Sequence, residues 1–164
     1  MQAVLMGDKA FLKGERAEAI DAYTEAIEAD PDEPLAYCRL AEAQLTEGHL
    51  DEASTQLVAA LAKEAPEPLR ATALFLTAEV RERQHKWKAA KAAWKEYAAF
   101  LSRAKAPGHD KAAGAETARE RTALVEQKAQ DEEAYRAVRE RAEKRRAELE
   151  KTAAENAKKD AQGR

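Results

Sequence analysis

One pattern of small and aromatic residues occurs three times along this chain, and it constrains the fold more than any other feature. The second copy follows the first after 34 residues (7 to 41), and the third follows after a further 37 (41 to 78). The first copy consists of Gly7, Gly14, Ala19, Tyr23, Ala26 and Pro31. The second consists of Ala41, Gly48, Ala53, Leu57 and Ala60, with Pro66 one place late, and the third of Ala78, Ala90, Trp94 and Tyr97. A unit of this length buries its apolar face only against neighbouring units, so the pattern predicts a stacked array.

The spacing of apolar residues within each unit predicts helices. Apolar residues recur at steps of three and four, and no segment alternates with a period of two, so we expect no sheet. The 164 residues include only 6 Gly and 5 Pro, and 36% of them are charged, which is typical of helical chains. The expected helices cover residues 2–13, 17–30, 34–47, 51–63, 68–84 and 87–104.

Each unit carries small residues where two paired helices would meet. Gly7 on the first helix and Ala19 on the second would permit close approach, with Tyr23 filling the space beside them. Gly14 and Gly48 stand where a turn with positive φ is expected between the helices of a pair. Pro31 would end a helix, because proline cannot continue one.

This pattern resembles the tetratricopeptide repeat family, whose unit is a helix–turn–helix of about 34 residues. The resemblance covers residues 1–107. It implies an all-α fold, a right-handed helix–turn–helix solenoid of three repeats at about 1–33, 34–67 and 68–105. The third repeat departs from the family pattern, because His85 stands at the turn glycine and Thr77 at a position where the family prefers leucine.

The chain changes character after Pro107-Gly108, which is its clearest break. We expect residues 108–129 to form a capping helix, since a solenoid needs its last open face covered. Its expected apolar side would pack on the surface of the third repeat. That side comprises Ala118, Ala123, Leu124 and Val125, and the surface comprises Trp94, Tyr97, Phe100 and Leu101.

Residues 130–164 predict an extended charged helix with a frayed end. Pairs such as Glu132 and Arg136 lie four residues apart and support an exposed helix. Tyr135, Val138, Ala142 and Leu149 follow the spacing of a coiled-coil seam, but Arg145 occupies its next core position, so we expect no self-standing coiled coil. The segment is then either a solvated helix or a partner-docking helix that uses Tyr135, Val138 and Leu149.

Composition and motifs argue against catalysis and against several ligand classes. The net charge of −3 gives no basic surface for nucleic acid. The three histidines have no ligand three or four residues away, so no metal site is expected. No phosphate loop or hydrolase motif occurs, so we expect neither catalytic residues nor a cofactor, and the protein is not expected to be an enzyme.

The N-terminus and the single cysteine, Cys38, suggest a compartment. The N-terminus has no basic region before its short apolar run, and no run of about 18 apolar residues occurs, so membrane insertion is not expected. A single cysteine forms no internal disulfide and fits a reducing environment. We therefore expect a cytoplasmic protein, although a leader removed earlier would leave no trace in this sequence.

The family resemblance implies that the first helix of each repeat lines a concave groove that binds a peptide or helix of a partner protein. Residue by residue, it assigns to this groove Val4, Asp8, Phe11, Leu12, Leu35, Cys38, Glu42, Leu45, Thr72, Phe75, Glu79 and Arg83. Some relatives hold the C-terminal carboxylate of chaperones with Lys, Asn and Arg, but Val4 and Asp8 stand here where Lys and Asn would be needed. We therefore expect a ligand with apolar anchors and basic flanks.

Three alternatives remain open. The apolar groove residues could be buried within the solenoid, which would leave no dedicated ligand. The chain could be a structural or assembly subunit that acts through its charged C-terminal helix, with the repeats as an anchor. Self-association is also possible at the N-terminal edge, Ala3–Met6.

Overall fold

The chain forms helices throughout the part that the structure describes. The computed structural model describes the backbone of residues 2–104 and 111–162, and the side chains of residues 2–104 and 114–156. The predicted break at Pro107-Gly108 lies outside these residues, and the backbone before Gly163 is helical up to Gln162. The chain divides into two units, Met1–Glu126 and Gln127–Arg164, which are described separately below.

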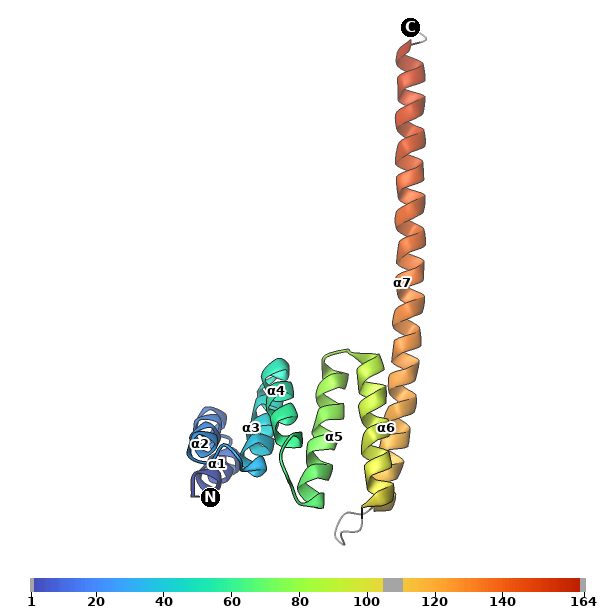
Figure 1. The fold of residues 1–164 in the computed structure, drawn as a ribbon. Helices are drawn as coiled ribbons and strands as arrows, with labels where there is room; N and C mark the ends of the chain where they lie inside the picture. Colours follow the sequence, from blue (N-terminus) through green and yellow to red (C-terminus); the bar gives the residue numbers. More distant parts are fainter. Residues whose placement is uncertain (1, 105–110, 163–164) are drawn as a thin grey trace. The chain divides into compact units, whose positions relative to one another are not determined.

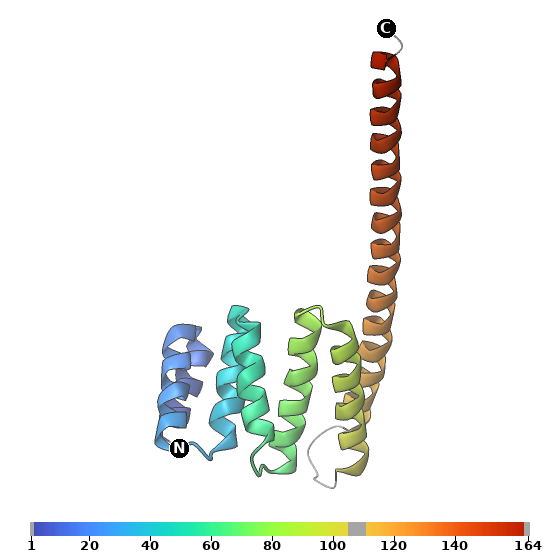
Figure 2. The same ribbon diagram turned by 45° about the horizontal axis from the view of Figure 1, so that its top comes forward.

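The first unit contains three successive pairs of antiparallel helices, drawn from blue to yellow in Figures 1 and 2. The pairs are α1 (Gln2–Lys13) with α2 (Arg16–Ala29), α3 (Pro34–Glu47) with α4 (Leu50–Leu61), and α5 (Glu67–Arg83) with α6 (Trp87–Arg103). The second helix of each of the first two pairs also packs on the first helix of the next pair, α2 against α3 and α4 against α5. This arrangement confirms the predicted all-α solenoid of helix–turn–helix repeats.

The same turn joins the helices within all three pairs. Gly14, Gly48 and His85 have φ angles of 86°, 83° and 56°. In each turn the following residue donates its N–H to a carbonyl five residues back, for example His49 to Gln44 at 2.8 Å and Lys86 to Arg81 at 3.0 Å. Glycine adopts this left-handed conformation without steric cost, whereas His85 adopts it against the preference of an L-residue.

The small residues of the repeat lie at the closest helix contacts. Ala19, Ala53 and Ala90 are each 0% exposed. A Cβ placed on Gly7 would lie 2.4 Å from Cε1 of Tyr23, so only glycine fits against this ring. The predicted role of these positions in close helix packing is therefore confirmed.

Helix α7 (Lys111–Gln162) contributes its first part to the first unit. Ala118 and Val125 are buried in one cluster with Trp94, Tyr97 and Leu101, as expected for a segment that covers the third repeat. The expectation for Ala123 and Leu124 is wrong, because both are exposed, Leu124 by 42%. Three consecutive residues span about 200° of a helix, so only one of Ala123, Leu124 and Val125 faces the core.

The second unit consists of the remainder of α7. All its described side chains from Asp131 to Asn156 are exposed. Pairs four residues apart lie along it, between Glu132 and Arg136 at 3.6 Å, Arg139 and Glu143 at 2.9 Å, and Arg146 and Glu150 at 2.9 Å. Within the residues described, no helix is both long and apolar enough to cross a membrane.

Candidate interaction surface

Three carboxylates on the first helices of the repeats form the centre of the predicted groove. Asp8 on α1, Glu42 on α3 and Glu79 on α5 occupy equivalent positions of the three repeats. Their side chains are 32%, 38% and 23% exposed. They are therefore held partly within the protein while each remains open to solvent.

Arg39 connects two of these carboxylates, a role that the sequence pattern did not indicate. Its Nε lies 3.3 Å from Oδ1 of Asp8, at ion-pair distance but without hydrogen-bond alignment. Its guanidinium also donates to Oε2 of Glu42 at 3.0 Å. Burial lowers the pKa of Arg39, but the hydrogen bond to Glu42 and the charge of Asp8 outweigh burial and raise it overall. Arg39 thus stays charged and joins α1 to α3.

Asp8 has a further partner inside the first repeat. The hydroxyl of Tyr23 donates to Oδ1 of Asp8 at 2.7 Å. Burial, together with this bond to an anion, raises the pKa of Tyr23 far above its usual value. Tyr23 therefore holds the Asp8 carboxylate from within the first repeat, while Arg39 approaches it from the second repeat.

Arg83 plays a similar part between the second and third repeats. One guanidinium nitrogen lies 3.2 Å from Oε1 of Glu79, and another donates to the carbonyl of Leu45 at 3.0 Å. The side chain is 49% exposed. Both Arg39 and Arg83 are thus already engaged by acceptors of the protein itself.

Several predicted groove residues lie in the core instead. Val4, Cys38 and Leu45 are only 4%, 3% and 4% exposed, so their assignment to a ligand-binding surface is corrected here. Their side chains fill the space that the small residues leave between helices, Val4 beside Tyr23 and the other two beside Ala41 and Leu57. Burial also raises the pKa of the Cys38 thiol to about 11, which keeps it protonated and unreactive.

The other apolar groove positions differ in how much surface they present. Leu12 is 85% exposed, while Leu35 and Thr72 are half-buried. Phe11 is half-buried with the guanidinium of Arg16 3.9 Å above its ring. Phe75 is also half-buried, with its ring edge-to-face with Trp94 and Tyr97 at 5.3 and 5.6 Å. Phe75 therefore contributes mainly to the packing of the third repeat.

Glu82 belongs to the joint between the third repeat and α7. Its side chain is 11% exposed, and its Oε2 accepts from Nε1 of Trp94 at 3.2 Å and lies 3.2 Å from Nε of Arg121. Lys91 and Glu126 form a second ion pair between α6 and α7. These contacts are polar counterparts of the buried Ala118 and Val125, and they fix the first part of α7 on the repeats.

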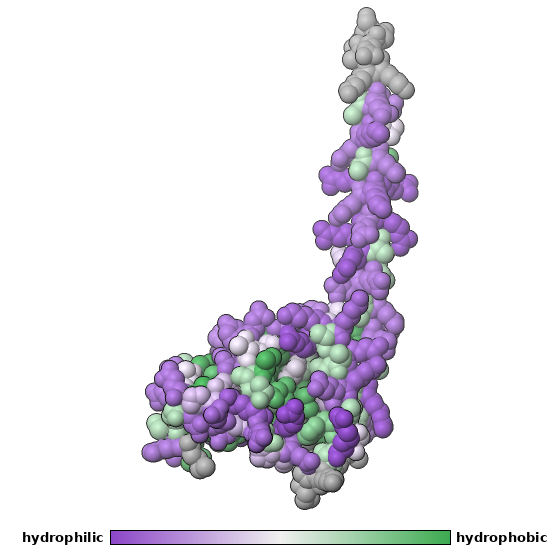
Figure 3. Space-filling view, in the orientation of Figure 1, coloured by the Kyte–Doolittle hydropathy of each residue, from purple (hydrophilic) through white to green (hydrophobic). Residues whose placement is uncertain are grey.

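Apolar side chains also gather on the face that Figure 3 presents, over α4 and α5, with polar residues around them. Val58 on α4 is 61% exposed, which the sequence pattern did not indicate. On the second unit, the predicted docking residues Tyr135, Val138 and Leu149 are 71%, 58% and 63% exposed. Exposed apolar groups framed by charge are typical of interaction surfaces.

Beyond these surfaces, the described residues form a shallow depression and no cluster of metal ligands. A shallow depression of roughly 310 Å³ lies between α6 and α7, beside Lys95, Ala98 and Thr122. Among the described residues, no group of three or more His, Cys, Asp or Glu side chains is arranged to hold a metal ion. The described surface is thus one of charged rows and apolar patches.

Residues 7–48 match the sequence model of a family described as TPR repeat. No curated protein matches the chain. Among solved structures, the TPR2B domain of yeast Sti1 in its pHsp70 complex has a TM-score of 0.67 at 20% identity, over 77% of this chain and 94% of that one. The first TPR of Spaghetti (RPAP3) bound to an HSP90 peptide gives 0.60 and 22%, over 76% and 88%. The Sgt2 TPR domain from Aspergillus fumigatus gives 0.61 and 22%, over 77% and 80%. Residues 7–48 thus match the family described as TPR repeat, and the stacked helix pairs have the same fold as these TPR domains.

Proposed function

We propose that this protein is a protein–protein interaction module, an adaptor or scaffold subunit, that binds a peptide or helix of a partner along α1, α3 and α5. The row of carboxylates formed by Asp8, Glu42 and Glu79 carries this proposal. The solved relatives support the general mode, since two of them are complexes with pHsp70 and with an HSP90 peptide. The tetratricopeptide family is typically a non-catalytic binding module, and we propose the same for this chain.

The charge of the row specifies the ligand. Three carboxylates face two guanidinium groups, and both guanidinium groups are already engaged within the protein. Opposite charges attract and like charges repel, so the row favours Lys or Arg and disfavours an additional carboxylate. We therefore propose a ligand with basic flanks, and not the acidic C-terminal tail of a chaperone.

The apolar contacts would come from the groove residues that keep exposed surface. Leu12 is the most open, and Leu35 and Phe11 add half-buried area on α3 and α1. Val4, Cys38 and Leu45 would support these residues from the core without touching the ligand. A ligand side chain that covers Leu12 would bury most of an exposed leucine, worth about 1.5–3 kcal/mol.

Selection of peptides displayed on phage, with the full chain as bait, tests the proposal directly. We expect the enriched peptides to combine apolar residues with Lys or Arg on one or both sides. Their affinities are then measured by fluorescence polarisation at low and high salt. Binding should weaken as salt rises, because screening reduces the attraction between the carboxylate row and the basic flanks.

Charge-reversal variants locate the binding surface. Glu42→Lys and Glu79→Lys should each weaken a selected peptide at least about tenfold, which corresponds to about 1.4 kcal/mol. Glu28→Lys, on the exposed side of α2, is the matched control and should leave the affinity unchanged. If Glu28→Lys weakens binding as much as the groove variants do, or if the enriched peptides are acidic, the proposed groove is wrong.

The HSP90 peptide SRMEEVD, present in one solved relative, gives a complementary test. We expect no binding of this peptide to the wild-type chain in the same polarisation assay. Micromolar affinity for it would contradict the charge argument, because its glutamate and aspartate side chains and its carboxylate end would have to lie beside Asp8, Glu42 or Glu79.

A structural role is the second candidate, in which the charged end of α7 does the work and the repeats serve as an anchor. The exposed Tyr135, Val138 and Leu149 favour it. Deletion of residues 130–164 separates the two, since the first compact unit ends at Glu126 and should remain folded. A groove ligand should bind the shortened chain normally, whereas a partner of the charged helix should be lost.

A further inference from the structure

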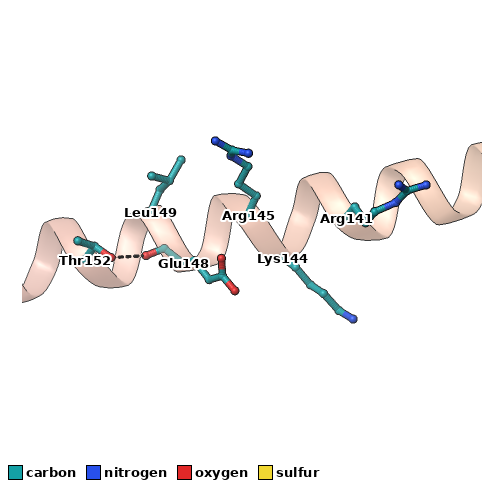
Figure 4. Close-up of a pocket in the computed structure, with 6 residues that line it drawn as sticks. All are labelled: Arg141, Lys144, Arg145, Glu148, Leu149 and Thr152. Carbon is teal, nitrogen blue, oxygen red and sulfur yellow. Dashed lines mark hydrogen bonds between the residues drawn. The ribbon is translucent and has the colours of Figure 1, made fainter.

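The exposed apolar residues of the second unit lie on one side of α7. Tyr135, Val138, Ala142 and Leu149 follow steps of three, four and seven, which place them on a common face of a helix. Figure 4 shows Leu149 projecting from the same side of the helix as Arg145, with Lys144 on the opposite side. We call the face formed by Tyr135, Val138, Ala142, Arg145, Leu149 and Thr152 the stripe.

The stripe is complementary to itself when two copies run in opposite directions. A two-fold axis between residues 143 and 144 places each residue of the stripe opposite the residue of the second copy that lies equally far on the other side of the axis. Val138 then faces Leu149 of a second copy, and Tyr135 faces Thr152. Arg145, which would interrupt an apolar seam, faces the small Ala142 and has room to extend to solvent.

Charges beside the stripe favour the same direction. In the antiparallel register, Arg141 lies alongside Glu148 of the second copy, twice by symmetry. In a parallel pair, Arg141 would instead lie beside Arg146 of the other copy, which is repulsive. On the other side of the stripe, Arg139 lies alongside Arg146 of the second copy. Each of these arginines is paired with a glutamate of its own helix at 2.9 Å, Glu143 and Glu150, and these pairs offset the repulsion.

We propose that residues 132–155 of α7 form an antiparallel two-helix coiled coil with a second copy of this chain. The interface has two Ala–Arg pairs at its centre, two Val–Leu contacts outside them and Tyr–Thr contacts at its ends, so the dimer is weak and forms at high concentration. This inference does not depend on the groove, since a monomeric chain would retain α1, α3 and α5 unchanged.

Sedimentation velocity on the full chain over a concentration series tests the association. We expect a monomer–dimer equilibrium that Leu149→Lys weakens at least tenfold. Ala147→Lys is the matched control, because it adds the same charge to the same exposed helix on the side away from the stripe. A wild-type chain that stays monomeric at about 0.5 mM, beyond the Kd of even weak specific pairs, overturns the proposal. Equal loss with Ala147→Lys overturns it as well.

Disulfide trapping tests the direction, in a Cys38→Ala background. Val138→Cys and Leu149→Cys should cross-link when the two variants are mixed and not when either is oxidised alone. Two copies of residue 138 would lie roughly 16 Å apart along the antiparallel pair (11 residues at 1.5 Å), too far for a disulfide. Cross-linking of each single variant with itself would show a parallel pair and refute the antiparallel register.

Discussion

The contact between Gly7 and the ring of Tyr23 makes Gly7→Ala an informative perturbation. The added methyl group would lie 2.4 Å from Cε1 and 2.6 Å from Cδ1 of Tyr23. An ordinary carbon–carbon contact is about 3.5–4 Å, so the ring must move by about 1 Å or more. The ring is only 1% exposed, and its hydroxyl bonds to Asp8 at 2.7 Å, so such a movement disturbs both the core and the hydrogen bond.

Opposing effects determine the size of the change. Overpacking of a core costs about 1–3 kcal/mol, and loss of the Tyr23–Asp8 hydrogen bond adds about 0.5–1.5 kcal/mol. Alanine is favoured over glycine within a helix by about 1 kcal/mol, which acts in the other direction. We expect Gly7→Ala to lower the free energy of unfolding by about 1–2 kcal/mol, measured by urea denaturation followed by circular dichroism.

The second repeat supplies the matched control. Ala41 and Leu57 stand there at the positions of Gly7 and Tyr23, so the double variant Gly7→Ala/Tyr23→Leu copies a pair that this chain already uses. Tyr23→Leu alone should cost about 2–4 kcal/mol through the cavity it leaves. The double variant should lose at least about 1 kcal/mol less than the sum of the single variants. An increase in stability with Gly7→Ala alone would refute the reasoning, because the helix preference of alanine would then outweigh the contact.

Two further predictions concern a turn and a thiol. His85→Gly should raise the free energy of unfolding by about 0.5–1 kcal/mol in the same assay, because it removes the cost of a positive φ at a non-glycine residue; Gln84→Gly, at a residue with φ of −73°, should not stabilise the chain. The pKa of Cys38 rises from 9.0 to about 11 on folding, so the unfolded chain loses this proton first as pH rises. Stability should fall between pH 9 and 11 by on the order of 2 kcal/mol relative to Cys38→Ala, and an equal slope in both proteins would contradict the burial of the thiol.

The repeats could be predicted from sequence because their signals are local. Gly14, Gly48 and Pro31 punctuate the chain, and the spacing of small residues marks the closest helix contacts. The six helices within the repeats begin and end within two residues of their expected positions. Such signals do not require knowledge of how the helices tilt against one another.

The division between groove and core required that knowledge. Cys38 and Glu42 lie one helical turn apart on α3, yet Cys38 is 3% exposed while the Glu42 side chain is 38% exposed. Arg39 was missed for the same reason, because its role depends on reaching Asp8 in the preceding repeat. Only the relative placement of α1 and α3 decides such cases, and a single sequence carries no direct record of that placement.

The sequence indicated where the array of repeats ends, but it did not identify the residue that packs there, Gly114. Tyr97 stands where the first two repeats have Ala26 and Ala60, which predicts a different neighbour. The structure supplies it, since a Cβ on Gly114 would lie 3.0 Å from the Tyr97 hydroxyl oxygen and 2.8 Å from a methyl group of Leu101. A large residue at this position calls for a small one in the following helix.

The sizes of the residues at each joint determine which repeats and helices could replace one another. Ala26 shares a core cluster with Ala36, and Ala60 shares one with Ala73, so the two internal joints have the same small-to-small form. The last joint differs from both, because it pairs the large Tyr97 with Gly114. An extra copy of the second repeat could therefore be inserted between existing repeats, whereas α7 transferred onto the second repeat would leave a void where the tyrosine ring belongs. The large Tyr97 and the small Gly114 therefore determine that α7 follows the third repeat and no other.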